Sequence, residues 1–135
     1  MDKKSHGVVV KQSPYSVEET ESRFIAILEE KELNIFATVD HAENATNAEL
    51  ELRPTRVVMF GNPKLGTPLM QCALCIAIDL PQKMLIWEDE AGDTKIAYND
   101  PQYLAERHGL GECESETIEK ISGALDQLSG GAIAP

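Results

Sequence analysis

Short runs of hydrophobic residues, separated by turn-forming residues, predict five β-strands in this chain. Apolar runs rich in β-branched residues and bounded by Gly, Pro, Asn or Asp are typical of buried strands. Val8 to Val10 and Arg56 to Phe60 have this form. Two later runs are joined by Glu90-Ala91-Gly92-Asp93 and predict an antiparallel hairpin. The expected strands cover residues 7–12, 35–39, 56–60, 83–88 and 94–98.

Helical spacing of apolar residues predicts a helix near each end of the chain. Ser16 followed by Glu19 has the form of a capping box, in which each side chain satisfies a backbone donor of the other residue. Apolar residues then repeat at helical spacing to about Glu32, and Asn34 can supply a left-handed cap. The last helix covers residues 115–129 and is expected to end at Gly130-Gly131.

Two further helices are predicted from a polar capping residue followed by proline. Proline suits the first position of a helix because the N–H donor that it lacks would have no partner there. Thr67-Pro68 therefore predicts a helix over residues 68–77, and Asp100-Pro101 predicts a short helix that ends at Gly109. The sequence does not decide whether residues 42–49 form a helical turn or a loop, because regularly spaced alanines alternate there with turn-forming Asn and Thr.

The order of these elements predicts a single α+β domain. The order is β-α-β-β-α-β-β-α-α. Leu50 and Leu52 alternate with charged residues, a pattern that is compatible with one more short strand. An α+β chain of this kind packs its helices on one face of a largely antiparallel sheet. We expect one domain over residues 1–135, with a core over about 7–129 and a flexible tail over 130–135.

The composition indicates an acidic globular protein. The 135 residues include 12 Lys and Arg against 23 Asp and Glu, which gives a formal charge of -11 at pH 7. Such a charge repels nucleic-acid phosphates and anionic lipid heads, so we expect no nucleic-acid partner and no membrane partner. No apolar run approaches the roughly 18 residues of a membrane helix. The sequence does not indicate which cofactor, if any, the protein uses.

The cysteines and the N-terminus predict a cytoplasmic protein with free thiols. Three cysteines are an odd number, and the polar N-terminus has no apolar segment of the kind found in a signal peptide. The spacing Cys72-x-x-Cys75 is also found in redox proteins. Cys72 falls more than one turn inside the helix expected from Pro68, however, where the helix dipole has little effect on a thiol. We therefore expect two small buried thiols.

Several short motifs in a fixed order resemble a known family. They are Asp40-His41-Ala42, Phe60-Gly61-Asn62-Pro63-Lys64, Gly66-Thr67-Pro68-Leu69-Met70, Asp79-Leu80-Pro81, Trp87-Glu88-Asp89 and Tyr98-Asn99-Asp100-Pro101 leading to Arg107-His108. The chain resembles the domain-of-unknown-function family 302 from about Gly7 to Leu128. The resemblance implies a small bacterial α+β domain that associates as a homodimer and has no established reaction. The pair Cys72 and Cys75 departs from the family pattern.

The loop from Gly61 to Thr67 is the first candidate site. It joins a buried strand to the expected start of a helix, where free backbone donors and the helix dipole can hold an anion. Asn62, Lys64 and Thr67 would contact the ligand. The glycine spacing is close to that of a nucleotide P-loop, but Thr67 stands where that motif requires lysine. The alternative is a tight turn at Asn62 and Pro63, with Thr67 only capping the helix.

A second candidate site consists of polar side chains predicted near the ends of the elements. They are Asp40, His41, Glu88, Tyr98 and His108. A histidine beside a carboxylate can act as a general acid or base near neutral pH, which makes His41 with Asp40 or Glu88 a candidate catalytic pair. In the alternative interpretation Asp40 and Asp100 are helix caps and His108 interacts with a helix dipole. The spacing does not match a metal site, and none is predicted.

Three larger side chains complete the candidates. Trp87 on the predicted hairpin could line a pocket. Tyr103 and Arg107 are four residues apart on one helix face, and Arg107 could bind a carboxylate ligand or form an ion pair with Glu88 or Asp89. The leading hypothesis is a module that binds a small ligand, with an anion as one option, at Asn62, Lys64 and Thr67, surrounded by His41, Trp87 and Arg107. The alternatives are an acid–base enzyme and a dimeric assembly domain.

Overall fold

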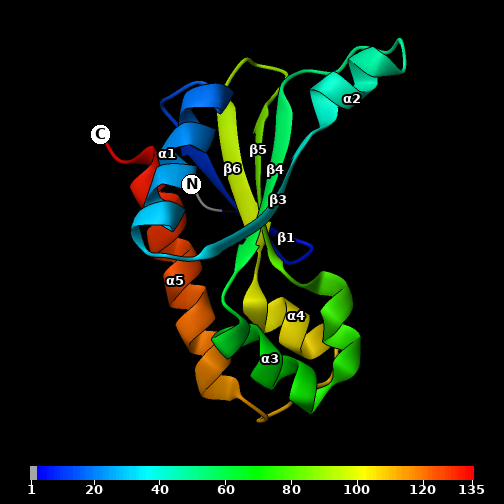
Figure 1. Ribbon diagram of the computed structural model, residues 1–135, viewed down its shortest axis with the longest axis vertical. Helices are drawn as coiled ribbons and strands as arrows, with labels where there is room; N and C mark the ends of the chain where they lie inside the picture. Colours follow the sequence, from blue (N-terminus) through cyan, green and yellow to red (C-terminus); the bar gives the residue numbers. More distant parts are fainter. Residues whose placement is uncertain (1–2) are drawn as a thin grey trace.

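Six antiparallel strands form a single sheet in the computed structural model, which describes residues 3–135 (Figure 1). The strand order is β1-β2-β6-β5-β4-β3, and every neighbouring pair is antiparallel. The α+β prediction and the predicted order of elements are confirmed. The strands are β1 (Lys3–Ser5), β2 (Val8–Ser13), β3 (Asn34–Asp40), β4 (Thr55–Gly61), β5 (Gln82–Glu88) and β6 (Thr94–Asn99).

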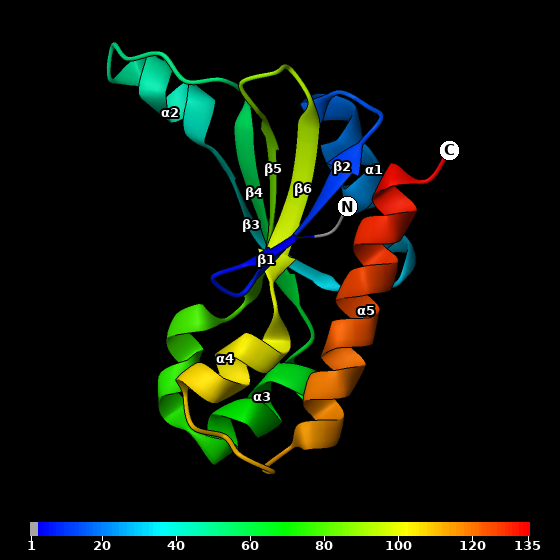
Figure 2. The ribbon, with the colours of Figure 1, turned by 180° about the vertical axis from the view of Figure 1, so that it is seen from behind.

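The helices form one layer on the sheet and a separate group beyond one of its ends. Figure 1 shows α1 and α5 side by side, and Figure 2 shows that no helix lies over β4, β5 and β6 on the opposite face. The group of α3, η1 and α4 lies beyond the ends of β4 and β6 (Figure 2). The bounds are α1 (Val17–Glu30), α2 (His41–Asn47), α3 (Pro63–Cys72), the 3₁₀ helix η1 (Leu74–Asp79), α4 (Pro101–Arg107) and α5 (Ser115–Ile133). None of the helices within residues 3–135 is long and apolar enough to cross a membrane.

The core lies between the helical layer and the sheet. Val58 and Phe60 of β4 and Met84 and Ile86 of β5 point toward the helices and are almost fully buried. Phe24 of α1 is fully buried and contacts Phe60 edge to face, with the ring centroids 5.2 Å apart. Residues on the opposite face are less protected, because no helix covers them.

Local capping explains where several helices begin. The Ser16 hydroxyl accepts a hydrogen bond from the backbone N–H of Glu19 at 3.0 Å, which is the Ser16 half of the predicted capping box. Asp100 caps α4 in the same way, and its carboxylate accepts from the N–H of Gln102. Residues 42–49, left open by the sequence, belong largely to α2, which Asp40 caps by accepting from the N–H of Glu43 at 2.9 Å. No strand forms at Leu50 and Leu52, which are exposed.

The predicted start of α3 and the predicted left-handed cap after α1 are wrong. Helix α3 begins at Pro63, because the Asn62 side chain accepts from the N–H of Lys64 at 3.0 Å and Pro63 takes the first helical position. Thr67 is therefore not the cap, and Pro68 lies inside the helix. After α1 the left-handed residue is Glu32 rather than Asn34, which starts β3.

The predicted end of α5 at Gly130 is also wrong. The helix continues through Gly130 and Gly131 to Ile133, so the first residues of the expected flexible tail are helical. A Cβ atom at Gly131 would lie only 3.0 Å from Ile27 Cδ1, so this glycine allows α5 to approach α1 closely. The chain end is also held, because Arg23 Nε donates to the Ala132 carbonyl at 2.8 Å and Tyr15 donates to the Ala134 carbonyl at 2.6 Å.

Candidate functional site

An apolar cavity lies where β4 ends and α3 begins. Its volume is about 430 Å³. The walls come from β4, α3, the start of β5 and the inner face of α5, and nearly all the side chains are aliphatic, aromatic or sulfur-containing. These apolar lining residues are Leu33, Phe36, Met59, Phe60, Leu65, Met70, Ala77, Leu80, Ile121, Ala124, Leu125 and Leu128.

Few polar groups line this cavity, and none of its lining residues is charged. The polar lining side chains are those of Asn62, Thr67 and Gln82. Asn62 is also the cap of α3, so its side-chain oxygen already accepts one hydrogen bond from the helix. Lys64 is exposed and is not among the lining residues. Of the three residues predicted to hold an anion, the structure therefore brings Asn62 and Thr67 together at an apolar surface and leaves Lys64 outside it.

Asp40 and Glu88 line a second cleft at the opposite end of the sheet, with a volume of about 360 Å³. Arg56 lies in this cleft and donates to Glu21 Oε1 at 2.6 Å, while Asp40 Oδ2 is 3.5 Å away from its guanidinium. The hydrogen bond to Glu21 raises the pKa of Arg56, against the opposing effect of burial. His41 begins α2 and is exposed, and it is not among the lining residues.

Trp87, Tyr103 and Arg107 lie in three different places. Trp87 lies opposite Thr55 and Lys95 in the sheet register, on the face that α1 and α5 leave uncovered. The Tyr103 ring packs over Gly7, where a Cβ atom would lie only 2.2 Å from Tyr103 Cγ. Arg107 forms an ion pair, as its alternative interpretation held, but the partner is Asp79 rather than Glu88 or Asp89.

The structure brings together a histidine, a carboxylate and a thiol that the sequence analysis did not combine. His108 follows α4 and lies 2.6 Å through Nε2 from Asp79 Oδ2, and its Nδ1 is 3.1 Å from the Cys75 sulfur. The sequence predicts His108 near Asp40, and it predicts Cys75 in a buried pair with Cys72. These groups are 29 and 33 residues apart in the chain, so no local spacing indicates the cluster. No group of three or more side chains arranged to hold a metal ion is found within residues 3–135.

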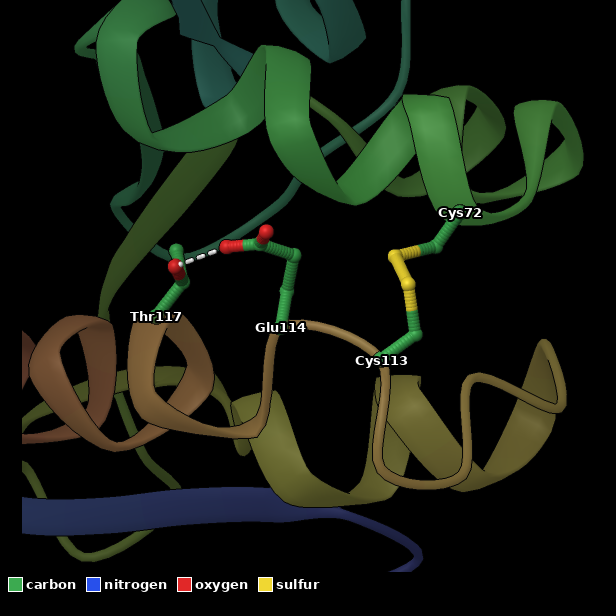
Figure 3. The surroundings of a disulfide bond; sticks show 4 residues. All are labelled: Cys72, Cys113, Glu114 and Thr117. Carbon is green, nitrogen blue, oxygen red and sulfur yellow. Dashed lines mark hydrogen bonds between the residues drawn. A yellow bond between two sulfur atoms is a disulfide. The ribbon is translucent and has the colours of Figure 1, made fainter.

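The prediction of two buried thiols at Cys72 and Cys75 is wrong. Cys72 forms a disulfide with Cys113, and Cys75 is the free cysteine and is exposed. The two bonded residues are 41 apart in the chain, but their Cα atoms are 6.2 Å apart because the end of α3 lies against the loop before α5. Figure 3 shows this bond next to Glu114 and Thr117, where the Thr117 hydroxyl donates to the Glu114 carboxylate. The Cys72–Cys113 disulfide therefore links α3 to the start of α5.

Fold and cavity together define a small α+β domain with one helical layer and an apolar cavity at one end of its sheet. The model of the family "Domain of unknown function DUF302" matches residues 9–128. The chain belongs to this family, as its motifs predict.

Curated relatives share much of the sequence but are longer proteins. A protein of Brucella suis named fluoride-specific ion channel FluC 1 is 45% identical over 115 residues, which are 85% of this chain and 45% of that protein. A protein of the same name from Brucella abortus is also 45% identical over 115 residues and is matched over 43% of its length. The chain thus spans less than half the length of the curated relatives that it matches.

A solved structure confirms the fold. The crystal structure of an uncharacterized conserved DUF302 protein from Bacillus stearothermophilus has a TM-score of 0.74 to this chain. The similarity covers 96% of this chain and 97% of that one at 15% sequence identity. At this identity the comparison supports the architecture alone.

Removal of the Cys72–Cys113 disulfide is expected to destabilise the fold. The double variant Cys72→Ser, Cys113→Ser should lose about 2–4 kcal/mol of unfolding free energy, because the bond restricts a long loop in the unfolded chain. Urea denaturation measures this difference. Cys75→Ser is the matched control and should change the unfolding free energy by less than about 0.5 kcal/mol, because it removes no cross-link. Equal stability of the double variant and the control would contradict the expectation.

Proposed function

We propose that this domain binds a small, uncharged and mainly apolar molecule in the cavity at the end of β4. The observation that carries the proposal is the cavity itself, with its apolar walls and a volume of about 430 Å³. Small-molecule sites are commonly concave and apolar, with a few polar groups that orient the ligand. Asn62, Thr67 and Gln82 supply such groups in the lining.

The same lining favours a neutral ligand over an anion. A buried anion needs a cation or several free donors to replace the water that it loses. The lining contains no Lys, Arg or His, and Lys64 lies outside it. The overall charge of -11 opposes an anion as well.

An acid–base enzyme at the opposite end of the sheet has less support. Asp40 and Glu88 do line one cleft, but His41 is not in its lining, so the proposed histidine base is not placed beside them. Arg56 there is already paired with Glu21 and lies close to Asp40. The cleft is better explained as the place where an ion pair fixes α1 to β4.

The uncovered face of the sheet supports association of two copies of the chain. Val57, Met59 and Leu85 lie on this face with Trp87, and all four are only partly buried. Apolar side chains on a face that no helix covers are available for a protein contact, although Lys83 and Lys95 lie on the same face. A two-fold arrangement would bury the same residues of both copies against each other.

The curated relatives suggest a second function, as a partner domain of a fluoride channel. The matched 115 residues leave more than half of each Brucella protein outside the similarity. No helix in residues 3–135 of this chain could cross a membrane. We therefore propose that the channel activity in the name of those proteins resides in the part that this chain does not match. We propose that the present domain associates with such a channel.

Location in the cytoplasm stays a prediction. The sequence supports it through the polar N-terminus and through three cysteines expected to be free, whereas the fold holds Cys72 and Cys113 in a disulfide. Disulfides are more common in oxidising compartments, so the cysteines no longer favour the cytoplasm.

Filling the cavity is expected to abolish binding of an apolar probe. A Cβ atom at Gly66 would lie 3.7 Å from Leu80 Cδ1, in ordinary contact, so Gly66→Leu should place its side chain in the cavity without unfolding α3. Nile red, an uncharged dye, should bind the natural chain and bind Gly66→Leu at least about tenfold more weakly, a loss of about 1.4 kcal/mol. Dye fluorescence titration measures both affinities.

Gly123→Leu is the matched control for this experiment. Gly123 lies on the exposed side of α5 with no atom within 4 Å of its Cβ position, so the same substitution there leaves the cavity open. Its dye affinity should equal that of the natural chain. Equal weakening in both variants would show that the dye does not report the cavity, and equal binding in both would exclude this cavity as the binding site.

Disruption of the uncovered sheet face is expected to give monomers. Leu85→Arg places a charge at the centre of that face, whereas Leu74→Arg makes the same change at a leucine that is 78% exposed on η1. Size-exclusion chromatography with light scattering should give a dimer mass for the natural chain and Leu74→Arg and a monomer mass for Leu85→Arg. A monomeric natural chain would contradict this, and so would dissociation by Leu74→Arg alone.

Association with a channel can be tested by co-purification. The part of the Brucella suis protein outside the matched 115 residues is expressed in membranes with a tagged copy of this chain. We expect the channel part to be retained by this chain in mild detergent. The Bacillus stearothermophilus protein, with the same fold and 15% identity, is the control and should not retain it. Retention by neither chain or by both would contradict a specific association.

A further inference from the structure

Cys75, His108 and Asp79 form a connected group outside both cavities. The Cys75 sulfur lies 3.1 Å from His108 Nδ1, and His108 Nε2 lies 2.6 Å from Asp79 Oδ2. The His108 side chain is 6% exposed and that of Asp79 is 15% exposed, so their contact is held within the fold. Cys75 and Asp79 come from η1, and His108 follows α4. In many catalytic sites a nucleophile contacts a base, and a third residue orients the base. Cys75, His108 and Asp79 have this arrangement.

The hydrogen bonds determine which nitrogen of His108 carries the proton. An ionised carboxylate only accepts hydrogen bonds, so Nε2 donates to Asp79. In the neutral ring Nδ1 is then an acceptor that faces the Cys75 thiol. Arg107 Nη1 donates to both oxygens of Asp79, at 3.1 and 3.0 Å, and keeps that carboxylate in place. His108 Nδ1 is therefore placed to accept the proton of the Cys75 thiol.

The surroundings of Cys75 favour a reactant that needs no binding pocket. Cys75 is exposed, and it lines neither of the two cavities described above. Its neighbours on η1, Leu74 and Ile78, are 78% and 73% exposed. Attack of a thiolate on a disulfide requires access and a proton for the leaving sulfur, and it requires no anion hole. The two other cysteines of the chain are already bonded to each other and do not compete.

We propose that Cys75 is a reactive thiol that exchanges with low-molecular-weight disulfides. His108 Nδ1 takes the Cys75 proton, and the thiolate attacks one sulfur of a disulfide RS–SR. The new bond joins Cys75 Sγ to one RS group, the old S–S bond breaks, and the second RS⁻ leaves with the proton from His108 as RSH. Cys75 is oxidised to a mixed disulfide, and the leaving sulfur is reduced. Cys75 and His108 are the catalytic residues of this step, and Asp79 and Arg107 are positioning residues.

The first test compares Cys75 in the folded and unfolded chain. Dithiodipyridine, an uncharged disulfide that releases a coloured thione, is mixed with the full chain prepared without reductant. One equivalent should react at neutral pH, at least about tenfold faster in the folded chain than in urea. An ordinary thiol is only a few per cent ionised at this pH. Transfer of the thiol proton to His108 therefore increases the fraction of reactive thiolate, and with it the rate. Equal rates in the folded and unfolded chain would overturn the proposal without any variant.

The second test separates the role of His108 from a structural one. His108→Asn should reduce the rate of the folded chain at neutral pH about tenfold, and below neutral pH its rate should fall about tenfold per pH unit, as for an isolated thiol. The natural chain should have a different pH profile, because His108 Nδ1 rather than solvent takes the Cys75 proton. Asp79→Asn should move the pH profile toward that of His108→Asn, because a neutral amide supports the protonated ring less well.

The controls make each outcome interpretable. Cys75→Ser should not react, and its reaction would overturn the assignment of the thiol. His6→Asn makes the same substitution at an exposed histidine near the N-terminus and should react like the natural chain. Oxidised glutathione replaces dithiodipyridine in a final experiment, in which intact mass should increase by one glutathionyl group in the natural chain and His6→Asn. An unchanged pH profile in His108→Asn would overturn the proposal.

Discussion

The edge-to-face contact between Phe24 and Phe60 determines much of this structure. Both rings are essentially removed from solvent, and their centroids are 5.2 Å apart. Phe24 holds α1 on the sheet, while Phe60 lies next to the last residue of β4 and also lines the apolar cavity. The same contact therefore fixes the helical layer and one wall of the proposed binding site. A smaller side chain at Phe60 would alter the core and the cavity together.

The two ends of the sheet differ in chemistry. At the end where β4 starts, carboxylates surround Arg56, and its bond to Glu21 joins α1 to the sheet. At the other end the apolar cavity lies close to η1, whose Ala77 contributes to the cavity wall while Cys75 is exposed to solvent. The candidates that the sequence grouped around one pocket are thus divided between these ends and the uncovered face. A strand of six or seven residues is long enough to keep such groups apart.

The sequence predicts local features well and long-range contacts poorly. The five strands, the Ser16 cap and the Asp100-Pro101 helix depend on neighbouring residues, and each is found in the structure. Asn62-Pro63 and Thr67-Pro68 carry the same capping signal five residues apart, and the chain uses the first. Gly131 is predicted to end the last helix, but it lies inside α5 and allows this helix to approach Ile27 closely. The Cys72–Cys113 bond and the contact of Cys75 with His108 join distant segments, which no spacing rule reports.

The pairing of Cys72 with Cys113 has a consequence for the lifetime of any adduct on Cys75. Many redox proteins use a neighbouring second thiol to release a bound partner and close an internal disulfide. Here the cysteine three residues before Cys75 is already bonded elsewhere, and the chain has no fourth cysteine. A group attached to Cys75 therefore stays until an external thiol removes it. The modified state would then record the thiol-to-disulfide ratio of the surroundings rather than turn over by itself.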